Sequence, residues 1–165
     1  MINKISRIIL IACAIFIGFS VQAKEEDIPA IYSVDVLSMD ISNKIANAAV
    51  KHCANLGYEV SAAVVGRDGL LIAFLRSPFA GPHTIQATQQ KAYSAASIQA
   101  RTSAMGHRPD LSFAPGILLI PGGIPLNFNG KFYGGVAVGG APPAIDEKCA
   151  DAGINAVKGI MDFVE

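Results

Sequence analysis

The chain contains no tryptophan and little charge: 16% of its 165 residues are charged, with 13 basic residues against 13 acidic ones. It has no cluster of lysine and arginine, and nucleic-acid binding needs such a positive footprint. We therefore expect no nucleic-acid partner. The sequence also lacks a Gly-x-Ser-x-Gly elbow, a phosphate-binding loop and a His-x-x-x-His pair. No catalytic pair is visible, so the residues by themselves do not predict an enzyme.

The sequence has no apolar run of the length that a membrane span needs. The longest such run, Ile8–Phe19, has about 12 residues, whereas a transmembrane helix needs about 20. Lys4 and Arg7 precede this run, and Val21-Gln22-Ala23 follows it as a small-x-small cleavage site. This pattern predicts a secretory signal over residues 1–23. The mature chain, residues 24–165, is then a single periplasmic or secreted domain with no transmembrane span and a net charge of −2.

Cysteine is scarce, and the position of each cysteine carries a prediction. Leu10-Ile11-Ala12-Cys13 resembles a lipoprotein box, so lipidation of Cys13 competes with simple secretion. The very short apolar stretch before Cys13 favours secretion. Cys53 and Cys149 remain in the mature chain, and an even count in an oxidising compartment is compatible with a disulfide. The alternative is two buried free thiols that pack as small apolar residues.

Hydrophobic periodicity and turn signals divide the mature chain into helices and hairpins. Helices are expected over residues 38–55 and 84–100 and after Pro142-Pro143, with a short helix near 103–105. Strands are expected over residues 58–65, 70–75, 116–120, 124–128 and 132–138. Asn129-Gly130 is a strong hairpin signal because both residues tolerate positive φ. Since hairpins dominate and no βαβ repeat occurs, the pattern predicts an α+β domain with a mostly antiparallel five-stranded sheet and helices packed on it.

Two of the helices show an apolar face in the sequence. The first face includes Ile45, Ala49 and His52, which makes His52 a core or interface histidine. The last helix repeats apolar residues at three- and four-residue spacing, which predicts a buried face of Ile145, Cys149, Ala152, Ala156, Ile160 and Val164. Asp146 and Glu147 open that helix, where carboxylates cap it and compensate its dipole.

Gly81-Pro82-His83-Thr84 places an imidazole at the start of the second helix, behind a Gly-Pro elbow. We expect Thr84 to be the N-cap, because its hydroxyl can accept from the first N–H groups. A helix N-terminus favours anions, and imidazole is a common axial ligand of haem iron. A surface histidine with one hydrogen bond is the alternative. Arg76 or Lys91 can meet a ligand carboxylate or stay solvated.

Two further features bear on a ligand site. His107 and Met105 are candidates for a second haem ligand, since imidazole and thioether groups both bind haem iron. Near the last two strands, glycine removes the side chains along one line, which marks close approach by a ligand or by another backbone. These glycines are Gly134, Gly135, Gly139 and Gly140.

Three segments together resemble the GlcG/HbpS family of haem-binding proteins, which is related to the C-terminal domain of PduO-type proteins. They run from Val64 to Arg76, from Gly81 to Ala95, and from Pro121 through Gly140 to Asp146. The resemblance covers roughly residues 40–160. It implies an α+β domain with an antiparallel sheet, a homo-oligomer, and in some members haem binding. Gly139 departs from the family pattern, where serine is common, which bears on ligand identity.

The resemblance assigns roles to several residues of this chain. His83 matches the axial-ligand position, Thr84 and Arg76 would hold the propionates, and Gly122 and Gly123 would let the ring approach the backbone. The leading interpretation is a secreted haem-binding protein that acts in haem or iron handling, by binding, sensing or transfer. The alternatives are an enzyme or accessory subunit for a small organic acid or a corrinoid, and a structural homo-oligomer that holds no haem.

Overall fold

The computed structural model describes residues 28–163, so the expected signal segment and Cys13 lie outside the described residues. The chain divides into two units, Met1–Ser33 and Val34–Glu165, and each is considered by itself. In the first, residues 28–33 form no helix or strand, and their side chains are exposed. The second holds every helix and strand that the structure describes.

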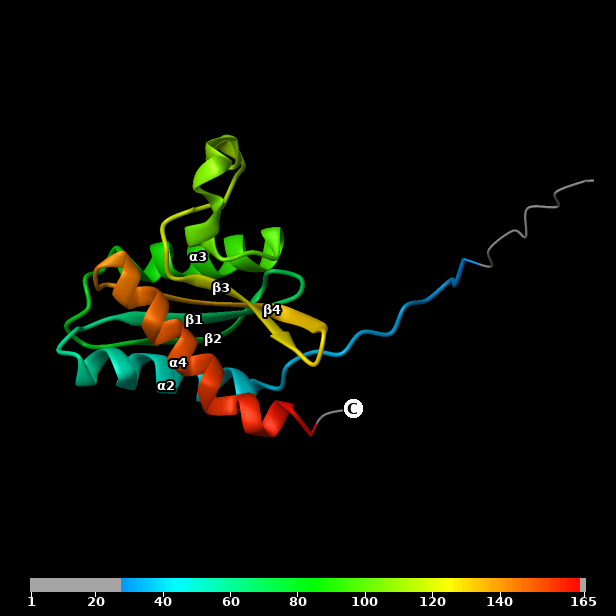
Figure 1. Ribbon diagram of the computed structural model, residues 1–165, viewed down its shortest axis with the longest axis horizontal. Coiled ribbons are helices and arrows are strands. Elements are labelled where there is room, and N and C mark those ends of the chain that lie inside the picture. Colours follow the sequence, from blue (N-terminus) through cyan, green and yellow to red (C-terminus); the bar gives the residue numbers. More distant parts are fainter. Residues whose placement is uncertain (1–27, 164–165) are drawn as a thin grey trace, which may run out of the picture. The chain divides into compact units, whose positions relative to one another are not determined.

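The second unit alternates helices with two β-hairpins (Figure 1). Its helices are α2 (Met39–Asn55), α3 (Thr84–Ile98) and α4 (Pro143–Met161), with two 3₁₀ helices, η2 (Thr102–His107) and η3 (Pro109–Phe113). Its strands are β1 (Ser61–Gly66), β2 (Leu71–Arg76), β3 (Gly123–Phe128) and β4 (Lys131–Gly139). The expected boundaries are confirmed to within a few residues, except for one strand.

The sheet of the described residues has four antiparallel strands in the order β2-β1-β4-β3, not five. The prediction of a strand over residues 116–120 was wrong. This segment is irregular, and the Leu118 amide donates to the Ser94 hydroxyl of α3 at 2.7 Å instead of to a neighbouring strand. The β3–β4 hairpin signal is confirmed, since Asn129 and Gly130 have φ values of 50° and 75°.

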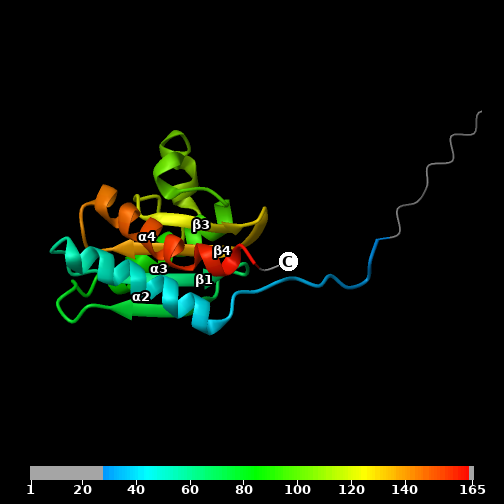
Figure 2. The same cartoon turned by 60° about the horizontal axis from the view of Figure 1, so that its bottom comes forward.

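The sheet lies between two helical layers: α2 and α4 cover one face, and α3 covers the other (Figures 1 and 2). Under α2 and α4 the core is built from bulky side chains, among them Ile45, Val64 and Leu126. Under α3 it is built from small residues, chiefly alanines, with Val65. Because these side chains are small, α3 lies close to the strand backbones.

Glycines in β4 make this close approach of α3 possible. A Cβ added to Gly135 would lie 2.4 Å from the Ala92 carbonyl oxygen, and one added to Gly139 would lie 2.5 Å from the Thr88 hydroxyl oxygen. Both distances are shorter than any real Cβ contact. The line of glycines therefore marks approach by another backbone, which was one of the two expectations for it.

The buried faces of two helices differ from those expected. The core side of α4 consists of Asp146, Cys149, Ala150, Gly153, Val157 and Met161. It shares Cys149 with the predicted face and is otherwise displaced by about one residue, while Val164 lies outside the described residues. The pattern missed this face because Asp146 and Gly153 are not apolar. The core alternative for His52 was wrong, because this residue is exposed near the end of α2, and the interface alternative stays a prediction. Among residues 28–163, no helix is long and apolar enough to span a membrane.

Candidate functional site

His83 lies at the N-terminus of α3, and its imidazole is exposed. The ring packs over the loop that precedes it: a Cβ added to Gly81 would lie 2.6 Å from His83 Cε1 and 2.8 Å from Nδ1. Glycine at 81 is therefore what lets the imidazole fold back over the chain. In the described part of the chain, neither ring nitrogen of His83 has a hydrogen-bond partner. The loop thus positions the imidazole ring, and both ring nitrogens stay available to bind a ligand.

Thr84 does not cap the helix, contrary to expectation. The N-cap position is His83, and Thr84 is the first helical residue, with its side chain buried. Its hydroxyl donates to the Gly81 carbonyl oxygen at 2.7 Å and lies 2.7 Å from the Ser61 hydroxyl of β1. Thr84 therefore ties the loop that carries His83 to the first residue of β1, a central strand of the sheet, and its hydroxyl faces the protein interior.

Arg76 ends β2 and lies beside the same loop. The Arg76 side chain is exposed, and its Nη2 donates to the carbonyl oxygen of the buried residue Ala80. This bond places the guanidinium against the segment that leads to His83 and leaves most of its donors free for a partner in solvent. Arg76 and His83 thus lie at the two ends of one short loop, and a ligand site shared by the two side chains stays a prediction.

Lys91 is buried, and its ammonium group is paired with an acidic side chain. Its side chain is 4% exposed, and Nζ lies 2.9 Å from Asp146 Oδ2 and 3.0 Å from the Pro121 carbonyl oxygen. The other oxygen of Asp146 accepts from the Ala141 amide at 3.0 Å. Burial raises the pKa of the Asp146 carboxyl, and the neighbouring ammonium partly offsets this rise. Asp146 lies in the first turn of α4, as expected, and it also forms an ion pair that links α3 to α4.

Gly122 and Gly123 lie over this ion pair and under α3. A Cβ on Gly122 would lie 2.8 Å from Lys91 Nζ, and one on Gly123 would lie 2.5 Å from the Lys91 carbonyl oxygen. The Gly123 amide also donates to the Thr102 hydroxyl at 3.0 Å. The chain itself fills the space beside both glycines, so close packing of α3 accounts for them.

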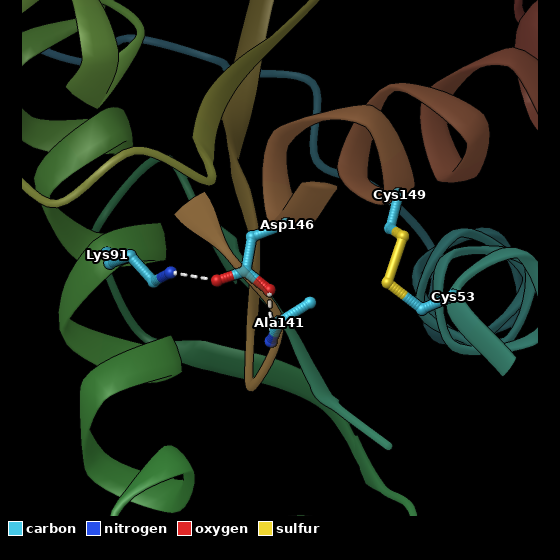
Figure 3. The surroundings of a disulfide bond; sticks show 5 residues. All are labelled: Cys53, Lys91, Ala141, Asp146 and Cys149. Atoms are coloured by element: carbon cyan, nitrogen blue, oxygen red, sulfur yellow. Dashed lines mark hydrogen bonds and ion pairs between the residues drawn. A yellow bond between two sulfur atoms is a disulfide. The ribbon is translucent and has the colours of Figure 1, made fainter. Parts of the chain in front are cut away.

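Cys53 and Cys149 form a disulfide that joins α2 to α4, with a Cα–Cα distance of 5.6 Å and both residues fully buried. Asp146 lies three residues before Cys149 on the buried side of α4, and Figure 3 shows Lys91 beyond Asp146 on the side of α3 and Cys53 beyond Cys149 on the side of α2. The N-terminal half of α4 is thus fixed to α2 by a covalent bond and to α3 by an ion pair. The cysteine count anticipated the pairing, whereas nothing in the sequence pointed to the ion pair.

The candidates for a second haem ligand lie in η2. Met105 is 7% exposed, and His107 is exposed with Nδ1 3.1 Å from the Ala104 carbonyl oxygen. Arg101, just before η2, holds this segment to α4 through Asp151 and Glu147, and these bonds raise the pKa of the guanidinium. Among residues 28–163, no three histidine, cysteine or acidic side chains gather in a metal-binding cluster.

An apolar cleft that the sequence did not predict begins one turn of α3 beyond His83. Gln86, Gln90 and Tyr93 of α3 face Leu70 and Leu71 across it, and the cavity measures about 300 Å³. We call it the Tyr93 cleft. The spacing of these α3 residues from His83 was readable in the sequence. The opposing wall was not, because it comes from the β1–β2 hairpin and from the segment around residue 116.

Comparison with known proteins identifies relatives of the chain. The model of a family described as haem-degrading protein, HbpS-like, matches residues 37–155. A crystal structure of a double mutant of HbpS from Streptomyces reticuli is 34% identical in sequence, with a TM-score of 0.73 over 77% of this chain and 90% of that chain. A second HbpS structure is also 34% identical, with a TM-score of 0.74 over 78% and 94% of the two chains.

A more distant likeness shows the fold alone. A crystal structure of a PduOC–haem complex is 22% identical, with a TM-score of 0.69 over 74% of this chain and 95% of that chain. No curated protein matches the chain. The family match covers most of the described second unit, and the HbpS structures share its architecture. The chain therefore belongs to the HbpS-like family.

Proposed function

We propose that this protein binds haem, with His83 as an axial ligand of the iron and Arg76 as a partner of the propionates. The observation that carries the proposal is the exposed, pre-positioned imidazole at the start of α3, whose ring nitrogens have no partner among the described residues. The membership of an HbpS-like family described as haem-degrading supports it, as does the haem in the PduOC complex.

The residues present fit such a ligand. Neutral imidazole is a standard haem ligand, and the guanidinium of Arg76 offers the bidentate donors that carboxylates accept. The first amides of α3 add a partial positive charge at the same corner. Thr84 would not contact haem itself. Its hydroxyl holds the loop that presents His83. When bound, haem would supply an iron centre, and the described residues would hold and orient it.

Two substitutions separate the proposed roles. In His83→Ala we expect a shifted Soret maximum and weaker haem binding, because the axial ligand is lost. In Arg76→Met we expect an unchanged Soret maximum and affinity lower by about two- to fivefold, as for one exposed ion pair. His52→Ala, an exposed histidine on α2, is the matched control. A spectrum that is the same in wild type and His83→Ala would contradict the assignment.

We also propose that the protein is secreted after cleavage near Ala23. The buried disulfide supports this location, since such bonds persist in oxidising compartments. The basic and apolar segments before Ala23 have the order of a secretory signal. A mature chain that begins at Lys24 is the expected result of N-terminal sequencing. A chain that begins at a lipidated Cys13 would contradict it. Assembly into a homo-oligomer stays a prediction.

A further inference from the structure

The Tyr93 cleft has fixed walls. Gly69 and Gly116 both adopt positive φ, and a Cβ on them would lie 2.7 Å and 3.3 Å from ring atoms of Tyr93. The phenol ring is thus flanked by two stretches of backbone that only glycine can form here. One of these stretches is held to α3, because the Leu118 amide donates to the Ser94 hydroxyl at 2.7 Å. The cleft is therefore formed before any ligand arrives.

The chemistry of the lining favours a flat ligand that is uncharged where it is buried. Leu70, Leu71 and Tyr93 supply apolar and aromatic surface, and the polar side-chain groups are the glutamine amides of α3 and the hydroxyl of Tyr93. None of the described residues that line the cleft carries a charge. A buried charge without a counter-charge costs free energy, whereas an aromatic wall attracts a planar ring. A charged group of the ligand must therefore stay outside the cleft.

The cleft and the proposed iron site lie along one side of α3. His83, Gln86, Gln90 and Tyr93 follow one another at spacings of three and four residues, so their side chains share a face of the helix. At 1.5 Å per residue, this stripe is about 15 Å long. A cavity of about 300 Å³ is at the lower end for ligand sites. It suits one edge of a large ring better than a whole ligand.

We propose that the Tyr93 cleft is a ring-binding subsite that takes the apolar edge of a planar tetrapyrrole and recognises it independently of iron. The proposal rests on the proposed function, since the carboxylates and the metal would then lie at the Arg76 and His83 end. His83 would supply coordination, and the cleft would supply recognition of the ring. A tetrapyrrole without iron should therefore bind here, and the loss of His83 should leave that binding intact.

The test uses iron-free protoporphyrin IX, followed by its fluorescence on titration into the protein. We expect saturable binding to wild type and equal affinity for His83→Ala. Leu71→Glu places a carboxylate in the cleft and should weaken binding at least about tenfold. Leu56→Glu is the control, because both leucines are 47% exposed and Leu56 lies at the end of α2. Gln90→Glu is a second variant that alters the cleft from α3, and circular dichroism verifies the folding of each variant.

The outcomes separate this inference from the proposed function. Equal porphyrin affinity in wild type, Leu71→Glu and Gln90→Glu would overturn the subsite. Loss of porphyrin binding in His83→Ala would overturn recognition independent of iron. If wild type binds haem but not iron-free porphyrin, the subsite fails while haem binding stands. If wild type binds neither molecule, both proposals fail.

Discussion

Replacing Lys91 by methionine should lower the free energy of unfolding by about 3–5 kcal/mol. The substitution keeps the length of the side chain but leaves the Asp146 carboxylate buried without its cation, since this ion pair is only 4% exposed on either side. Removal of one partner of a buried pair costs far more than the pair contributes as a whole. Urea unfolding of the two proteins measures the difference.

A double variant, and the pH dependence of stability, distinguish the loss of the ion pair from a loss of packing. Lys91→Met with Asp146→Asn removes both charges and keeps an acceptor for the Ala141 amide, so most of the stability should return. Because burial raises the pKa of Asp146, the folded state holds that proton more tightly than the unfolded one. Stability is then lost as pH rises above about 4, so the deficit of Lys91→Met should be smaller at pH 5 than at pH 8. A double variant as unstable as Lys91→Met would contradict the ion-pair account.

Removing the disulfide should have an effect of similar size. The bond spans a sequence separation of 96 residues, and the chain-entropy model gives about 4–5 kcal/mol for a loop of that length. The paired variant Cys53→Ala with Cys149→Ala should unfold at a correspondingly lower urea concentration. The unfolding midpoint of wild type in the presence of reductant should approach that of the double variant. This comparison is the control for changes in packing at the two alanines.

A thiol count on the chain from Lys24 onward, which lacks Cys13, checks the same bond directly. Because the disulfide joins both cysteines and survives denaturation without reductant, we expect no reactive thiol in the native protein and none in the denatured, unreduced protein. After reduction and denaturation, we expect two reactive thiols. Two free thiols in denatured, unreduced protein would contradict the disulfide, and so would equal unfolding midpoints for the variant and wild type.

Much of the fold could be predicted from local signals in the sequence. The Asn129-Gly130 turn and the Gly-Pro break before α3 each depend on a backbone preference of one or two residues. The false strand over residues 116–120 shows the limit of this approach. That segment is apolar enough for a strand, but its amide partner is a serine on α3, a contact that only the tertiary structure reveals.

The site was predictable only where one short segment carries it. Gly81 to Thr84 could be read as a helix entrance with an available imidazole, although Thr84 turned out to anchor the loop instead of capping the helix. Lys91 was misread because a charged residue on a helix normally faces water. The Tyr93 cleft joins parts of α3 and a hairpin that are distant in sequence, so periodicity along the chain could not indicate it.

The most direct test of the central claim is a haem titration of the chain from Lys24 onward, followed at the Soret band, with His83→Ala measured beside it. The account predicts a saturable Soret change in wild type, and in the variant a shifted maximum with a weaker affinity. A linear, unsaturated rise in wild type would contradict haem binding. Saturable binding that is identical in both proteins would contradict the assignment of His83 as the ligand.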